Sequence, residues 1–138
     1  MYTVEWGVLA DNVIRDADRN TVSIIDLIEA VTTTNFPVLI PRVIALWLIT
    51  RDTVDPNKEM FEMALRLNGQ DLNRFPIAVT FEGKLRARCI VGINSIILQA
   101  PGTLEATLSF GGQVLATRRV VVLLNAPAPV GTIGASHG

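Results

Sequence analysis

Residues 101–124, PGTLEATLSFGGQVLATRRVVVLL, decide the fold class. Apolar and polar side chains alternate strictly from Thr103 to Phe110, which is the period of a strand that buries one face. The Gly111-Gly112 pair then allows a tight reversal, and a second apolar, β-branched run follows it. We therefore predict a β-hairpin in an all-β protein.

The register of this hairpin depends on the length of its loop. A three-residue loop, Gly111-Gly112-Gln113, keeps apolar partners together: it pairs Phe110 with Val114, Leu108 with Ala116, and Leu104 with Val120. It also sets Glu105 opposite Arg119, whereas a two-residue loop sets Leu104 opposite that arginine. The pattern favours the three-residue loop.

Further strands are expected before the hairpin. Residues 42–52, RVIALWLITRD, are apolar on both faces and predict a central strand. Strands are also predicted for residues 3–10, ending at Asp11-Asn12 with NVIR as a short continuation, for 75–81 and for 86–98, with a turn at residues 82–84. The two prolines of NFPVLIP, residues 35–41, indicate an extended crossing segment rather than a helix or a central strand.

Two segments are ambiguous. In residues 22–33, Ile24, Leu27 and Ile28 have helical spacing, yet most residues are β-branched and favour a strand. In residues 56–67, Asp55 as N-cap and the proline after it favour a helix. The alternative for that segment is a strand with Phe61, Met63, Leu65 and Leu67 on one face and a hairpin turn at Asn68-Gly69.

Four motifs suggest a family: VEWGVLAD near the start, VSIIDLI after a turn, FPVLIP before a long apolar strand, and PGTLEATLSFGGQVLATRRVVV at the end. Over residues 3–124 the chain resembles a family of small uncharacterised bacterial proteins with an expected immunoglobulin-like fold. The resemblance implies strands for residues 22–33 and 58–67, and it implies no activity. Leu104 stands where such sandwiches often have an aromatic residue, so we expect no tyrosine corner and purely apolar packing there.

We therefore predict an immunoglobulin-like antiparallel β-sandwich of about seven to eight strands over residues 1–125, with one short helix around residues 56–67 as the alternative. Residues 126–138 are rich in Pro, Gly and Ala and are expected to form a flexible tail.

Composition narrows the function. Twelve basic and thirteen acidic residues give a net charge of -1 without a run of either sign, which argues against nucleic-acid binding. The central apolar run is too short for a membrane span, and the start lacks the features of a signal peptide, so a cytoplasmic or virion-associated protein is expected. Only 18% of residues are charged and mean hydropathy is +0.39, which suggests that some apolar surface lies in a subunit interface.

A calcium loop is the first candidate site. In DADRNTVSIIDL, residues 16–27, Asp16, Asp18 and Asn20 alternate like calcium ligands. An EF-hand loop needs Gly at its sixth position and Glu at its twelfth, but Thr21 and Leu27 stand there. We predict a solvated hairpin turn instead.

The residue types that carry catalysis are scarce. Cys89 lies in an apolar strand pattern and is expected to be an inert buried thiol, and His137 lies in the tail, out of reach of any partner. The three serines considered as nucleophiles, Ser23, Ser95 and Ser109, have no histidine and no nucleophile-elbow motif. No sequence argument brings together the acids Asp11, Asp52, Asp55 and Asp71. A hairpin explains Gly111-Gly112-Gln113 better than a phosphate loop does.

Two surface hypotheses remain. Trp6 and Trp47 lie in strand patterns and are predicted to fill the core rather than to form a sugar-stacking platform. Lys84, Arg86 and Arg88 alternate along a strand; they are expected to form a solvated face, with a basic stripe for an anionic partner as the alternative.

The sequence thus favours a non-enzymatic interaction or assembly module that forms a homo-oligomer or binds a protein partner, with no catalytic, cofactor or metal site. The alternatives are a virion or particle surface protein and an enzyme that acts through carboxylates alone, which would need two acids to converge in a cleft.

Overall fold

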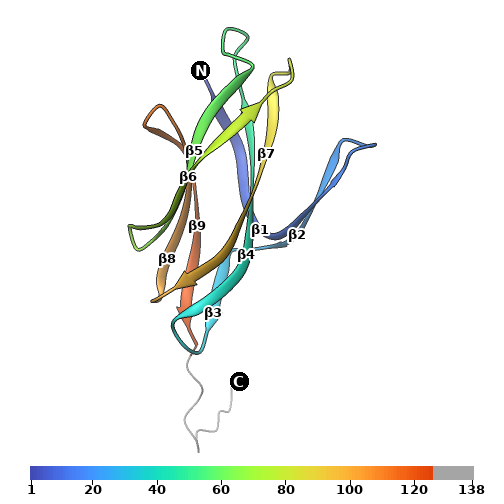
Figure 1. The fold of residues 1–138 in the computed structure, drawn as a ribbon. Helices are drawn as coiled ribbons and strands as arrows, with labels where there is room; N and C mark the ends of the chain where they lie inside the picture. Colours follow the sequence, from blue (N-terminus) through green and yellow to red (C-terminus); the bar gives the residue numbers. More distant parts are fainter. Residues whose placement is uncertain (126–138) are drawn as a thin grey trace, which may run out of the picture.

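The computed structural model describes residues 1–125, in which the chain forms nine strands and no helix (Figure 1). The strands are β1 (Thr3–Asp16), β2 (Thr21–Leu27), β3 (Ala30–Thr33), β4 (Val38–Thr50), β5 (Lys58–Leu67), β6 (Gln70–Thr80), β7 (Arg86–Leu98), β8 (Gly102–Phe110) and β9 (Gln113–Leu124). The all-β prediction is confirmed, with nine strands in place of seven to eight. No helix in this range is long and apolar enough to cross a membrane. The predicted tail, 126–138, lies outside the described residues.

The strands form two packed sheets. Sheet A has the order β2-β1-β4-β7, and sheet B has the order β3-β9-β8-β5-β6. Neighbouring strands are antiparallel except for β3 and β9, which are parallel. The prediction of a purely antiparallel sandwich is therefore wrong at this pair. The reason is that the chain leaves sheet A after β2 and enters sheet B as β3, which runs in the same direction as β9, the last strand of the chain within residues 1–125.

Alternate side chains of the two sheets fill the core. Trp47 and Ile49 of β4 and Met63 and Leu65 of β5 are fully buried. Burial of each such side chain stabilises the fold by about 1.5–3 kcal/mol. Strand β4 pairs with both β1 and β7, so the prediction of a central strand is confirmed.

An aromatic cluster forms one end of this core. The ring of Tyr2 lies edge-on to Phe61 and Phe110, with centroids 5.0 and 4.9 Å away, and stacks on Phe81 at 5.9 Å. Such pairs contribute about 0.5–1.5 kcal/mol beyond the area that they bury.

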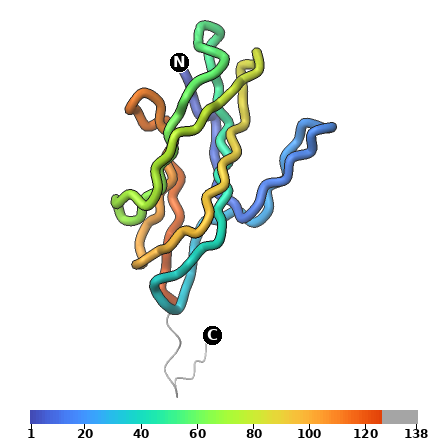
Figure 2. The backbone as a smooth tube through the Cα atoms, in the orientation of Figure 1, coloured from blue at the N-terminus to red at the C-terminus, as the bar shows by residue number. Residues whose placement is uncertain are grey.

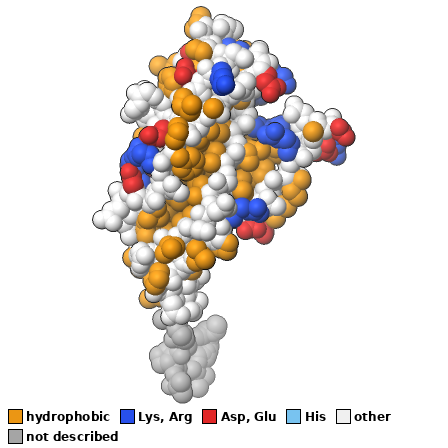
Figure 3. All heavy atoms as spheres, viewed as in Figure 1, with side chains coloured by type: hydrophobic (Ala, Val, Ile, Leu, Met, Phe, Trp, Pro, Cys, Tyr) orange, Lys and Arg blue, Asp and Glu red, His pale blue; other side chains and the backbone are white. Residues whose placement is uncertain are grey.

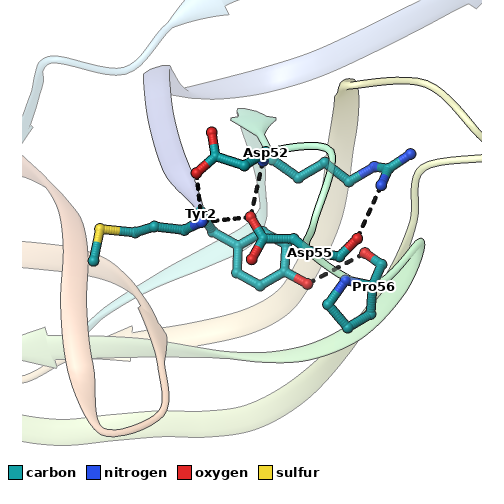
Figure 4. A network of polar contacts seen from close by, with 6 residues as sticks. Tyr2, Asp52, Asp55 and Pro56 are labelled. Carbon is teal, nitrogen blue, oxygen red and sulfur yellow. Dashed lines mark hydrogen bonds and ion pairs between the residues drawn. The ribbon is translucent and has the colours of Figure 1, made fainter.

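A polar network closes the same end (Figure 4). The guanidinium of Arg51 is buried; it donates to the carbonyl oxygens of Lys84 and Asp55, at 2.7 and 2.9 Å, and lies over the Phe81 ring. The amino group of Met1 donates to the carboxylates of Asp52 (2.8 Å) and Asp55 (2.6 Å). These contacts bind the start of β1 to the turn between β4 and β5.

The expectation of a single strand over residues 22–33 is wrong in one respect. The segment is extended, but it forms two strands in different sheets, β2 in sheet A and β3 in sheet B. The chain bends at Asp26, whose φ is +54°, and Ile28 then donates to the carbonyl of Leu9 at 2.8 Å. This bend carries the chain from one sheet to the other.

The helix alternative for residues 56–67 is also wrong, because strand β5 occupies this segment. β5 pairs with β6 on one side and β8 on the other, and these two ladders outweigh the local helix preference. The carboxylate of Asp55 accepts from the backbone N–H of Asp52 at 2.8 Å, so the apparent cap serves a turn. The Asn68-Gly69 hairpin turn of the strand alternative is present, with φ values of +51° and +83°.

The β8–β9 hairpin has the predicted outer register and a different loop. Leu104 pairs with Val120, Glu105 with Arg119, and Leu108 with Ala116, as expected. However, Phe110 pairs with Gln113, so the loop is the two-residue Gly111-Gly112, and a bulge beside Leu115 restores the register. The three-residue loop and the Phe110–Val114 pair are therefore wrong predictions.

The segment 35–41 is not only a crossing segment, because Val38–Pro41 already belongs to β4. This part of β4 pairs with β7 alone, since pairing with β1 begins at Ile44. A proline, which lacks an N–H, is tolerated where a strand has a partner on one side only.

Strand β1 does not end at Asp11-Asn12 but continues to Asp16. Pairing of β1 with β4 stops at Ala10, while pairing with β2 continues to Asp16 and Thr21. Residues 11–27 therefore form a two-stranded arm, which projects from the body of the sandwich (Figure 2). We call residues 11–27 the β1–β2 arm.

Candidate functional site

The outer faces of the two sheets differ in chemistry. The outer face of sheet B carries ion pairs, among them Arg119 with Glu105 at 2.9 Å and Arg66 with Asp71 at 2.7 Å. On sheet A the side chains that alternate with the core residues are mostly apolar: Trp6, Val8, Ala10, Ile44, Leu46, Leu48 and Ile90. Ala10, Ile44 and Leu46 are buried, whereas Trp6, Val8, Leu48 and Ile90 are partly exposed, so the apolar surface that this face leaves open beside the β1–β2 arm is limited to these four side chains.

The tip of the arm is hydrogen-bonded to sheet A. Arg88 of β7 donates to the backbone carbonyl of Asn20 at 2.8 Å and to its side-chain oxygen at 3.3 Å. Asn20 lies in the turn of the arm, whereas β7 is the opposite edge strand of sheet A. The Arg88 side chain therefore bridges the space between sheet A and the tip of the projecting arm.

A groove of about 700 Å³ lies between the arm and sheet A. Trp6 of β1 and Leu48 of β4 contribute half-buried apolar surface to it. Its cationic lining consists of Arg15 from the arm, Lys84 from the β6–β7 turn, and Arg86 and Arg88 from β7. Figure 3 shows lysine and arginine side chains between the body and the arm. We call this the Trp6 groove.

One of these four cations is already neutralised. Arg86 donates two hydrogen bonds to the carboxylate of Glu5, at 2.7 and 2.5 Å, and Thr50 donates a third. The bonds from Arg86 and Thr50 lower the pKa of Glu5 to about 2, so Glu5 stays ionised at neutral pH. Within residues 1–125, Arg15 and Lys84 make no ion pair, and Arg88 bonds only to neutral oxygens of Asn20.

A second pocket of about 550 Å³ lies at the root of the arm. Asp11 and Asp26, from β1 and β2, line it together with Arg42 of β4. Two acidic residues, Asp11 and Asp26, thus line one pocket, and the sequence offered no argument for that. In the part of the chain that is described, no group of three or more His, Cys, Asp or Glu side chains could hold a metal ion.

Other acidic residues hold turns and strands together. Asp16 accepts backbone bonds from Asp18 and Arg19 at 3.1 and 3.2 Å, so the hairpin-turn interpretation of DADRN is confirmed. Asp71 pairs with Arg66 and Arg74, at 2.7 and 3.2 Å.

The three serines lie on different strands: Ser23 on β2, Ser95 on β7 and Ser109 on β8. His137 lies outside the described residues.

The two tryptophans differ in burial. Trp47 is fully buried, as predicted, but Trp6 is half-buried on the outer face of sheet A and lies outside the core cluster. The cause is a register shift between Val4 and Trp6, where Glu5 is the extra residue of β1. A bulge reverses which face each following side chain takes, and no local sequence signal marks it.

The basic residues Lys84, Arg86 and Arg88 all line the Trp6 groove. Sequence reasoning missed the two arm residues that complete it, Arg15 and Asn20. Asn20 and Arg88 are 68 residues apart, and only the folded arm brings them together.

Cys89 is the free thiol of the described part, and it is buried at 6% exposure. Burial raises its pKa from 9.0 to about 11. At pH 8 the reactive thiolate is then about 100 times scarcer than for an ordinary thiol.

We therefore expect the native protein to react with a disulfide reagent at pH 8 at least about 100-fold more slowly than the protein unfolded in urea. The absorbance of the released thiol measures this ratio, with a Cys89→Ser variant as the blank. Equal rates in the two states would contradict the buried, protonated thiol.

Comparison with known proteins gives a family match but no functional relative. A family model described as a family of unknown function, DUF6941, matches residues 5–123. No curated protein matches the chain.

Proposed function

The chain belongs to the DUF6941 family of unknown function, and from that premise we propose that it is a non-enzymatic interaction module that assembles with a second copy of itself through the β1–β2 arm. The observation that carries the proposal is the apolar surface of the arm. Ile14, Ile24, Ile25 and Leu27 are 50%, 38%, 37% and 55% exposed.

An arm of this kind has little stability on its own. A lone two-stranded hairpin is at best marginally stable in water, and the arm pairs with no third strand beyond Ala10. Exposed apolar side chains gathered on one element typically mark an interface. Ile14, Ile25 and Leu27 alternate onto one face of the arm, so a second copy that packs there would cover all three.

The low charge of the chain supports the same proposal, because a monomer with 18% charged residues has fewer polar groups than usual to cover its surface. The strand order supports the finer proposal that the sandwich is immunoglobulin-like. The run β9-β8-β5-β6 in sheet B corresponds to strands G, F, C and C′ of that fold, and β1-β4-β7 in sheet A corresponds to A, B and E.

The test is the molar mass of the intact chain by light scattering after size exclusion, at about 10–100 μM. We expect a dimer or a larger assembly, and we expect the double substitution Ile14→Glu/Ile25→Glu to give a monomer. Both side chains are exposed, so the variant should keep its β-sheet circular dichroism.

The matched control is Met60→Glu/Leu72→Glu, which places the same two charges at apolar sites that are 54% and 39% exposed on the other sheet and should leave the assembly intact. A wild-type chain that stays monomeric over this concentration range would refute the proposal. An assembly that survives the double substitution would refute the role of the arm.

A further inference from the structure

The Trp6 groove combines three features that together describe a ligand. The first feature is an apolar part of the lining, because Trp6 and Leu48 contribute half-buried surface there. The indole gives a broad, flat contact area that suits an apolar side chain or a planar group.

The second feature is local positive charge in an acidic protein. Four cationic side chains line the groove, against Glu82 among the lining acids, while the chain as a whole carries -1. Glu5 neutralises Arg86, which leaves Arg15, Lys84 and Arg88 without an acidic partner within residues 1–125. A ligand with complementary charge is therefore anionic.

The third feature is an open strand edge. β7 pairs only with β4, so the far side of β7 faces no other strand in its sheet, and its first residues, Arg86 and Arg88, border the groove. An unpaired edge offers backbone donors and acceptors in the spacing that an extended peptide can use. Charged side chains on an edge also guard against aggregation, but that role does not call for an apolar lining beside them.

We propose that the Trp6 groove binds an extended acidic peptide segment of a protein partner, with carboxylates on Lys84, Arg15 and Arg88 and an apolar side chain against Trp6. The open edge of β7 favours a peptide over a nucleic acid, which has no strand-like backbone to pair with that edge. This inference goes beyond self-association and does not depend on it, because every residue that lines the groove belongs to one chain.

The experiment uses the full chain and a short fluorescein-labelled peptide in which Glu alternates with Val. Fluorescence anisotropy should show saturable binding with a Kd in roughly the micromolar range, weakening as salt rises. The same peptide with Gln in place of Glu should bind at least about 10-fold more weakly. No saturation up to about 1 mM, or equal binding of the Gln peptide, would overturn the proposal.

The double substitution Arg15→Gln/Lys84→Gln locates the site, because neither side chain makes an ion pair within the described residues. It should weaken binding by about 10-fold or more. The matched control, Arg42→Gln/Lys58→Gln, removes the same charge at two other residues that make no ion pair within residues 1–125, and it should have little effect. Equal losses in the two variants would mean a non-specific charge effect, and tighter binding of a single-stranded oligonucleotide of similar length would overturn the assignment to a peptide.

The result can be separated from the test of self-association. An uncharged variant, Ile14→Ser/Ile25→Ser, should weaken self-association and keep peptide binding within about 3-fold, because neither isoleucine lines the groove and no charge is added beside Arg15. Loss of peptide binding in that variant would overturn the independence of the groove.

Discussion

A Gly7→Ala variant is expected to lose about 1–3 kcal/mol of unfolding free energy, although it adds a single methyl group. Gly7 of β1 lies opposite Trp47 of β4, and the indole ring covers it. A Cβ at Gly7 would lie 2.3 Å from Cε3 of Trp47 and 2.6 Å from Cζ3. Because Trp47 is fully buried between the sheets, its ring cannot move aside without displacing the core.

Urea unfolding followed by circular dichroism at a fixed protein concentration measures this loss. Gly92→Ala is the matched control on the same sheet, since its Cβ would lie at an ordinary 3.4 Å from Cδ1 of Ile44. The control should change stability by no more than about 0.5–1 kcal/mol. Equal effects at the two glycines would contradict the packing of Trp47 on Gly7.

A double-mutant cycle tests the mechanism. Trp47→Leu alone should cost several kcal/mol, in the order of 2–4, because it leaves a cavity. In that background Gly7→Ala should cost at least about 1 kcal/mol less than in the wild type, since the clashing ring is gone. Strict additivity would show that the two residues do not interact.

The second large effect is expected at Gly102, where β8 begins. Gly102 has φ +144°, and a Cβ there would lie 1.9 Å from Oδ1 of Asn68. That oxygen accepts from the N–H of Thr103 at 3.0 Å, and the amide nitrogen of Asn68 donates to the carbonyl of Pro101 at 3.0 Å. Gly102→Ala would strain the backbone and displace the asparagine, so we expect a loss of about 2–4 kcal/mol.

Two variants isolate the contributions to this loss. Gly112→Ala introduces backbone strain without a steric clash, because Gly112 has φ +82° and no atom lies within 4 Å of its Cβ position. It should lower the unfolding free energy by only about 1 kcal/mol. Asn68→Gly removes the obstructing side chain, and Gly102→Ala should cost less in that background. If Gly102→Ala and Gly112→Ala cost the same, Asn68 does not hold this corner.

This corner also corrects an expectation. Leu104 is buried at 2% exposure, which agrees with apolar packing in place of a tyrosine corner. The corner is not purely apolar, however, because the side chain of Asn68 bonds across it to the segment before β8. Asn68 and Thr103 are 35 residues apart, so the sequence around either one gives no sign of the contact.

The residues whose structure depends on near neighbours were predictable. Strict alternation predicted β8, and turn residues predicted the reversal at Gly111-Gly112, because the period of a strand and the backbone freedom of Gly are local properties. The reversal at Asn68-Gly69 was the alternative to a helix in that segment. The helix signal at Asp55-Pro56 was equally local, and it failed because β6 and β8 pair with β5 from outside the window in which propensity acts.

The sequence by itself determined the all-β class, the central position of β4 and most of the hairpin partners, since these follow from residue spacing. Only the tertiary structure decided that β3 joins β9, that the arm tip meets β7 and that Trp6 faces outward. The physical reason is that a bulge at Glu5 reverses the faces of β1 and that Arg88 and Asn20 meet only once the arm and sheet A have both formed. The candidate groove is made of these contacts, so its existence could not be predicted from spacing along the chain.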